Sequence, residues 1–418
     1  MQSAPRRHLA RRALEKPSKL YKIRTAVCED GERIPLIVDA VSGLPLVSPN
    51  QYVLRARRAS REVATMEKDL RNIGVLFVWA EANGIDLESR LRADANLSNR
   101  EIDNLIDAAR LDLRSVEDLP KGVRRIAPPI VSDETWAARL LTIRDYLVWH
   151  LDEAMSAAEF GSMRYQHLRE RRDALYRKIT SRIPITGRAK KKGLEPQLLE
   201  RLWSISHPDS EENPFQPAHR RRNQLIVEWL SKLGFRRGEL LKIRTSGTTT
   251  ARNATISVTR ERDDVEDPRR HEPRTKTLSR TVPIDDSAAR MADRYLETER
   301  SRIPGAKRTP FLFVARNGRP LTLSGLREVL RQIVHRHPEF KGKLSPHALR
   351  RTAADLLWGY LQDATHDDDE RTAIFNYLMG WTADSKQSQE YARGEIERRA
   401  TKASLGHQRR LFSKDGAR

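Results

Sequence analysis

Apolar side chains recur at helical spacing in the first part of the chain. From Arg58 onward they lie three or four residues apart, and the Asn83-Gly84 pair then interrupts the pattern. This spacing predicts an amphipathic helix that ends at the Asn-Gly pair. Its apolar face consists of Val63, Met66, Leu70, Ile73, Phe77 and Ala80.

Three more helices are predicted after this one. Ser98 and Glu101 form a capping-box pattern, and Ser132 precedes another run of apolar residues at helical spacing. A strongly basic helix follows over residues 163–179. Together these helices predict an all-helical domain over residues 54–180, which is an ordinary domain size.

Two segments flank this domain. Residues 1–53 comprise a basic arm and a loosely alternating stretch with turn signals at Asp30-Gly31 and Ser42-Gly43, which predicts a hairpin lead-in. Residues 181–196 contain two prolines, two glycines and a run of lysine and arginine but few apolar side chains. We interpret this segment as a basic linker.

The pattern of the remaining chain, residues 197–418, predicts a second domain that is mostly helical. Two segments of alternating polarity predict a small antiparallel sheet, and the pattern is helical again from Asp285. The helical part is interrupted by an apolar run at 311–314 and an Asn317-Gly318 turn. The predicted elements before Asp285 are helices over 196–205 and 220–233 and strands over 254–260 and 275–284. The fold class is therefore mainly α with a small antiparallel β-sheet.

Composition narrows the class of protein. The chain has 418 residues, of which 38% are hydrophobic and 32% charged, so it can bury a core in two or three domains. Its longest apolar run, Ile73–Ala80, is too short to span a membrane. A single cysteine, Cys28, excludes an internal disulfide and favours the cytoplasm. The basic N-terminus leaves an organellar transit peptide as the alternative.

The charge balance indicates a polyanionic partner. Lysine and arginine exceed aspartate and glutamate by 78 − 57 = 21. Nucleic acid is the commonest partner of so basic a chain, and a merely solvated basic surface is the alternative.

Five segments of the second domain carry the candidate chemistry. They occur in a fixed order and include an arginine, a lysine, a His-x-x-Arg pair, a Gly-Trp pair and a tyrosine. The tyrosine follows the tryptophan by ten residues. The segments are LGFRRGELLKIR at 233–244, RTKTLSRTVPI at 274–284, PHALRRTAADLL at 346–357, LMGW at 378–381 and SQEYARGE at 388–395.

This combination resembles the tyrosine recombinase family, the phage integrases and their relatives, from about Arg58 onward. The resemblance implies a SAM-like helical core-binding domain followed by a mixed α+β catalytic domain, which together clamp duplex DNA. It implies site-specific cleavage and rejoining of DNA through a 3′-phosphotyrosine, with no metal or other cofactor. It also implies four protomers on two DNA sites and service to a mobile element, in the cytoplasm at the nucleoid.

The resemblance assigns a role to each residue. Tyr391 is the nucleophile and His347 its base. Arg236 and Arg350 bind the phosphate, whose transition-state charge suits two permanently charged guanidinium groups. Lys276 protonates the departing 5′-oxygen.

Further residues support these. Trp381 donates a hydrogen bond to the phosphate, and Glu239 orients Arg236 or stiffens its helix. In the linker, Arg188, Lys190, Lys191 and Lys192 are placed to contact DNA phosphates.

Alternatives remain open for most of these positions. Arg237 competes with Arg236, and Tyr377 and Tyr360 compete with Tyr391. Arg274 and Arg280 lie near Lys276 and are its rivals. His347 and Arg350 could instead cap a helix, Trp381 could be core, and the linker could be a solvated loop.

Two features depart from the family pattern or leave a choice. The stretch at 362–371 lengthens the segment between His-x-x-Arg and Gly-Trp, and its acidic residues are expected to form a solvated loop. The tail, 392–418, carries an apolar stripe that packs on its own domain or on a neighbouring protomer. For the whole chain, a type IB topoisomerase and an inactive DNA-binding relative are the alternative functions.

Overall fold

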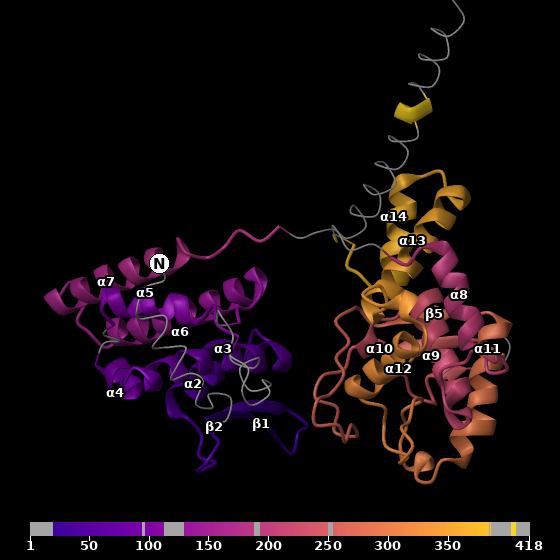
Figure 1. Ribbon diagram of the computed structural model, residues 1–418, viewed down its shortest axis with the longest axis horizontal. Helices are drawn as coiled ribbons and strands as arrows, with labels where there is room; N and C mark the ends of the chain where they lie inside the picture. Colours follow the sequence, from indigo (N-terminus) through magenta and orange to yellow (C-terminus); the bar gives the residue numbers. More distant parts are fainter. Residues whose placement is uncertain are drawn as a thin grey trace, which may run out of the picture. The chain divides into compact units, whose positions relative to one another are not determined.

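The computed structural model describes residues 20–93, 97–112, 129–187, 193–249, 254–383, 385 and 403–406. The chain divides into two compact units, residues 1–189 and 190–418. The division falls inside the basic segment 181–196. Each unit is described by itself below, with the helix and strand labels of Figure 1.

The first unit contains an antiparallel hairpin and a group of helices. Strand β1 (Tyr21–Val27) pairs with β2 (Arg33–Asp39), with Tyr21 opposite Asp39 and Val27 opposite Arg33. Gly31 and Gly43 adopt positive φ at the two predicted turns. The helices are α2 (Val47–Tyr52), which continues as a π-helical turn over Val53–Arg57, α3 (Val63–Ala82), α4 (Leu87–Arg92), α5 (Asn99–Ala108), α6 (Asp133–Ser156) and α7 (Met163–Thr180).

The four predicted helices of this unit are confirmed. Ser98 and Glu101 form the capping box of α5, and the Ser132 hydroxyl accepts a hydrogen bond from the backbone of Thr135 at the start of α6. The helices enclose an apolar core whose fully buried members include Leu70, Ile73, Leu76, Ile143, Tyr146 and Leu168.

The hairpin is part of this core and does not merely lead into it. Ile37 of β2 and Tyr52 of α2 are buried among the helical residues. Helix α2 was not predicted, because Pro49 and Asn50 oppose helix formation. It forms because the Asn50 side chain bonds both backbone groups of Ile37, each at 2.9 Å, and because Tyr52 packs against Tyr146.

The second unit consists of helices around a small sheet. The helices are α8 (Pro196–Ser206), α9 (Arg220–Lys232), α10 (Arg237–Lys242), α11 (Asp286–Arg294), α12 (Leu323–Arg336), α13 (Pro346–Ala364) and α14 (Asp368–Met379). The sheet is antiparallel with strand order β3-β4-β5, formed by β3 (Thr248–Thr249), β4 (Thr255–Val258) and β5 (Arg280–Pro283). Both predicted strands are thus present, in shorter form.

Helix α9 lies at the centre of this unit and packs against α8, α10, α11 and α13. Its Trp229 contacts the rings of Phe235 and Phe313, and the predicted apolar run at 311–314 is fully buried. A small apolar cluster in the second half of α13 joins Trp358 to Phe375 of α14.

The acidic stretch at 362–371 is mostly exposed, as expected, but only residues 365–367 of it form a loop. Helix α13 extends to Ala364, and Asp367 caps α14 by accepting hydrogen bonds from the backbones of Asp369 and Glu370. Acidic residues in the first turn of a helix are favoured by the helix dipole, which explains why a charged stretch is helical here.

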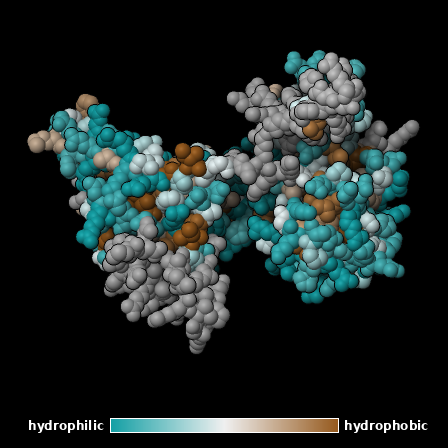
Figure 2. Space-filling view, turned by 45° about the horizontal axis from the view of Figure 1, so that its top comes forward, coloured by the Kyte–Doolittle hydropathy of each residue, from teal (hydrophilic) through white to brown (hydrophobic). Residues whose placement is uncertain are grey.

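No helix among the described residues has the length and apolar character needed to cross a membrane. Hydrophilic residues cover most of the described surface in view in Figure 2.

Candidate active site

Arg236 lies at the start of α10, directly after a sharp turn. Gly234 has a φ of 68° and lies against α13, where an added Cβ would be 3.2 Å from the Cβ of Ala353. The turn ends α9 and allows Arg236 to begin the next helix. The Arg236 backbone N–H donates to Glu239 at 3.0 Å, and its guanidinium lies 3.5 Å from the same carboxylate. The Arg236 side chain is 28% exposed, and the neighbouring residue Arg237 is exposed to solvent.

Glu239 is the centre of the arginine cluster. Its side chain is fully buried, and it accepts hydrogen bonds from the Thr277 hydroxyl and from Arg280, the latter at 3.1 Å. The Arg350 guanidinium lies 3.7 Å away. Burial acts to raise the pKa of the Glu239 carboxyl, but the charges of Arg280 and Arg350 and its hydrogen bonds hold the pKa below the ordinary value. Glu239 is therefore ionised at neutral pH.

Arg350 is held from several directions on α13. It donates to the backbone carbonyls of Gly234 and Met379, the latter at 2.7 Å. Its guanidinium lies 5.5 Å from the centre of the Trp381 ring, within cation–π range. Trp381 also contacts Phe375 edge-on, so its ring belongs partly to the apolar cluster and partly to the arginine site.

Lys276 is exposed between two buried threonines, Thr275 and Thr277, just before β5. Two glycines let its segment approach the site. An added Cβ at Gly238 would lie 2.0 Å from the carbonyl oxygen of Arg274, and one at Gly380 would lie 2.4 Å from Arg280. Only glycine accommodates these approaches.

The two rivals of Lys276 have structural partners. Arg274 pairs with Asp263 at 2.9 Å. Arg280 has a side chain that is 2% exposed and bonds Glu239, Thr277 and the carbonyl of Leu378. Of these three residues, only Lys276 is exposed.

His347 is exposed in the first turn of α13, three residues before Arg350. The helix is capped by the Ser345 hydroxyl and not by either predicted site residue. Both alternative tyrosines are exposed, Tyr360 on α13 and Tyr377 on α14. Tyr391 and the linker residues Arg188, Lys190, Lys191 and Lys192 lie outside the described residues.

The sequence match of this unit now decides its family. Residues 194–395 match the family model described as "Phage integrase family". The second unit is a phage integrase domain. This confirms the resemblance to tyrosine recombinases, and the mainly helical fold with a small antiparallel sheet agrees with the prediction.

The solved structures that match this chain include two complexes of the XerH site-specific recombinase. The post-cleavage complex with palindromic difH substrate is 14% identical with a TM-score of 0.44, covering 86% of this chain and 93% of that chain. The pre-cleavage complex with difH is 16% identical with a TM-score of 0.39, covering 79% of this chain and 96% of that chain. No curated protein sequence matches the chain significantly.

The sequence did not predict that Arg280 and Thr277 form hydrogen bonds with Glu239 in the integrase domain. A signal for Arg280 exists in the alternation of β5, where Arg280 and Val282 share the buried face. That a charged residue on this face binds Glu239 depends on α10 lying beside it, which the alternation does not reveal.

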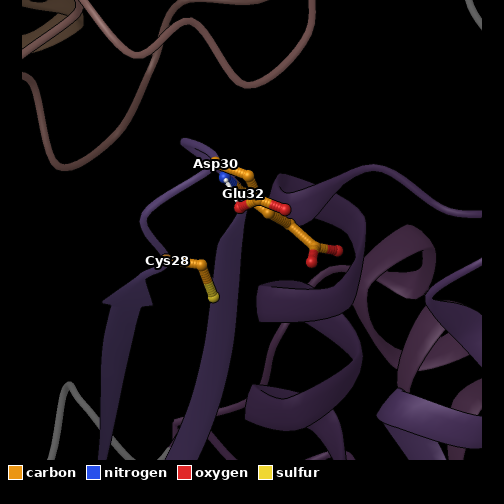
Figure 3. Close-up of side chains that lie close together, drawn as sticks. All are labelled: Cys28, Asp30 and Glu32. Carbon is orange, nitrogen blue, oxygen red and sulfur yellow. Dashed lines mark hydrogen bonds between the residues drawn. The ribbon is translucent and has the colours of Figure 1, made fainter.

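The described residues contain one group that could in principle hold a metal ion, and it lies in the first unit. Cys28, Asp30 and Glu32 offer ligand atoms within 4.8 Å of one another at the β1–β2 turn (Figure 3). Arg58 forms an ion pair with Glu32, and the Asp30 side chain accepts a hydrogen bond from the Glu32 backbone. These contacts explain the cluster as a structured turn.

Proposed function

We propose that this chain is a site-specific recombinase that cleaves and rejoins duplex DNA through a 3′-phosphotyrosine on Tyr391, in the service of a mobile element. The observation that supports this most strongly is the buried Glu239, around which Arg236, Arg280 and Arg350 converge. This arrangement holds the two motif arginines, Arg236 and Arg350, close together. The three positive charges exceed the single negative charge of Glu239.

This surplus suits a phosphodiester. The phosphate is anionic and gains charge in the transition state, and preorganised guanidinium groups stabilise that charge without rearranging. Arg236 and Arg350 form the clamp. Arg280 is buried behind them and balances Glu239.

The reaction balances without an added reactant. The Tyr391 oxygen forms a bond to phosphorus while the bond from phosphorus to the 5′-oxygen breaks. His347 accepts the phenol proton, and the Lys276 ammonium gives a proton to the departing 5′-oxygen. Trp381 packs against Arg350 and can donate its indole N–H to the phosphate. Rejoining is the reverse, so the energy of the phosphodiester is retained.

The DNA partner is a pair of recombination sites, and four protomers assemble on them. The basic charge of the chain supports a large phosphate-contacting surface. Arg188, Lys190, Lys191 and Lys192 of the basic linker are proposed to contact DNA phosphates. Replacing all four with alanine should lower the slope of log K against log salt by about 0.9 for each lost contact, on specific and random DNA alike. An unchanged slope would return this segment to a solvated loop.

The decisive experiment traps the covalent adduct. The full-length protein is incubated with a nicked suicide substrate that carries the site next to its own gene, and the adduct is resolved by denaturing electrophoresis. Tyr391→Phe should bind this DNA normally and form no adduct, while Tyr377→Phe and Tyr360→Phe form it as the wild type does. Peptide mapping that finds DNA on Tyr377 or Tyr360 would refute the assignment.

Two additions to this assay separate the rival mechanisms. Adduct formation should persist in EDTA, because the proposed charges come from side chains; loss in chelator with recovery in magnesium would contradict this. Strand exchange between two labelled sites distinguishes a recombinase from a topoisomerase, which would only relax supercoiled DNA.

A further inference from the structure

The connection that carries Lys276 is long and has an unusual interior. Residues 259–279 join β4 to β5 without a helix or strand of their own. Irregular connections of this length are ordinarily among the most mobile parts of a domain. A group that must protonate one particular oxygen needs a fixed position, so the path of this connection matters for Lys276.

One buried ion pair fastens the connection to α10. The Lys242 ammonium lies 2.7 Å from Glu272, and their side chains are 3% and 1% exposed. Lys242 also donates to the backbone carbonyl of Glu261 at 3.1 Å. A single side chain of α10 therefore holds both the early and the late part of the connection.

A second buried ion pair holds its middle. Arg269 and Asp267 lie 2.7 Å apart, with side chains 3% and 0% exposed. Arg269 also donates to the carbonyls of Leu241 and Leu321, at 3.0 and 2.8 Å, and its guanidinium lies 4.4 Å from the centre of the Phe311 ring. We refer to Lys242–Glu272 and Arg269–Asp267 as the anchoring pairs.

Burying two ion pairs is a costly way to obtain stability. Desolvation offsets most of the attraction, and apolar side chains of similar volume often stabilise a fold equally well. What charged pairs add is direction, because each hydrogen bond requires one geometry. These pairs therefore restrict the connection to one path more strictly than apolar packing would.

That path leads directly to the candidate acid. From Glu272 the chain continues through the buried Pro273, and the Arg274 carbonyl then lies against Gly238 on α10. The buried Thr275 and Thr277 flank Lys276, and Thr277 bonds Glu239. A shift at Glu272 would thus be transmitted over four residues to the lysine.

We propose that Lys242, Glu272, Asp267 and Arg269 are positioning residues that hold Lys276 at the departing oxygen. The inference rests on the proposed function, since it presumes that Lys276 is the general acid. Weakening the anchoring pairs should slow proton delivery to the 5′-oxygen by about 10- to 100-fold, the usual cost of displacing a catalytic group by about 1 Å.

The test uses a substrate that does not need the acid. Replacing the bridging 5′-oxygen of the suicide substrate with sulfur gives a thiolate leaving group. A thiol has a pKa of about 8.5, so the thiolate can depart without being protonated. Cleavage rates of the full-length protein are measured on the oxygen and sulfur substrates. The variants are Glu272→Gln, the apolar double variant Lys242→Met with Glu272→Leu, and Lys276→Ala as the reference.

Glu266→Gln is the matched control, because Glu266 belongs to the same connection but forms its ion pair with Arg244 at the surface. The double variant guards against unfolding, since it replaces the whole pair with apolar side chains. The neighbouring buried carboxylate, Asp264, lies 3.9 Å from Lys242 and keeps its ion pair with Arg244 at 2.9 Å. Thermal unfolding and DNA binding are measured for every variant.

We expect both anchoring variants to be slow on the oxygen substrate and restored on the sulfur substrate, as Lys276→Ala is, with Glu266→Gln unchanged on both. If Lys276→Ala is restored but the folded anchoring variants are equally slow on both substrates, or slow on neither, the positioning role is wrong. If Lys276→Ala itself is not restored, the acid role of Lys276 fails and the inference fails with it.

Discussion

The two units bury polar side chains in different ways. In the first unit, the Ser48 hydroxyl lies between Tyr146 and His150, at 2.6 Å from the histidine ring nitrogen, and ties α2 to α6. Burial lowers the pKa of His150 to about 4, so this cluster is uncharged at neutral pH. In the integrase domain, Glu239 instead gathers guanidinium groups that are all charged.

The difference follows from what each cluster can do. Uncharged hydrogen bonds join elements of a core at little desolvation cost. A charged cluster costs more to bury and is useful where an anion must be bound. Its location on α10, α13 and β5, each of which carries or adjoins a motif residue, is what supports an active site there.

The largest expected effect is at the charged cluster. Glu239→Gln keeps the side-chain shape but leaves the guanidinium groups uncompensated. We expect a loss of about 3–5 kcal/mol in the free energy of unfolding and a cleavage rate about 10² to 10³ lower. Denaturant unfolding and the adduct assay measure these effects.

Glu328→Gln provides the comparison, because Glu328 pairs with Arg331 on the exposed face of α12. It should change the free energy of unfolding by less than about 1 kcal/mol. Equal effects of the two substitutions on the free energy of unfolding would show that Glu239 does not stabilise the arginine cluster.

The next effect concerns the close approach of the Arg274 backbone to Gly238 on α10. In Gly238→Ala the new methyl group would overlap the Arg274 carbonyl, which must move. We expect about 3 kcal/mol of destabilisation and slower cleavage of the oxygen substrate, because the segment of Lys276 moves with it. Gly359→Ala is the control: Gly359 lies in α13 with no atom within 4 Å of the added Cβ, so alanine should stabilise slightly. A fully active and stable Gly238→Ala protein would refute this account of the segment.

The smallest effect is the pH dependence of the uncharged cluster. His150 has a folded pKa of about 4, below its unfolded value near 6.5, so the unfolded chain binds more protons between these values. Its stabilisation is complete above pH 6.5 and is lost as the pH falls toward 4. Between pH 7 and pH 5 the first unit should lose about 1–2 kcal/mol from this group.

His150→Gln should flatten that dependence without changing cleavage chemistry. Unfolding is followed by fluorescence of the full-length protein as a function of pH, with His335→Gln as the control because His335 lies on α12 in the other unit. A wild-type profile that His150→Gln leaves unchanged would show that the imidazole is not the titrating group.

Local signals explain which elements were predicted and which were missed. The capping box at Ser98 and the serine cap at Ser132 specify helix starts through contacts within a few residues, so the sequence alone locates them. Helix α2 could not be found in this way, since it depends on the hydrogen bonds between Asn50 and the backbone of Ile37 in β2. The acidic residues near Asp367 belong partly to a helix because Asp367 caps α14, and charge alone does not indicate a cap.

The sequence by itself predicted the family, from the order and spacing of Arg236, Lys276, His347, Arg350, Trp381 and Tyr391, and residues 194–395 match the family model. It could not decide which of several nearby arginines contact Glu239 and which face solvent. Arg236 and Arg237 are chemically identical, and so are Arg274 and Arg280; only the folded domain buries Arg280 against Glu239, pairs Arg274 with Asp263 and leaves Lys276 exposed. The physical reason is range. Motif chemistry is written in residue types, whereas burial and pairing depend on segments that are distant in the chain and meet only in the folded domain.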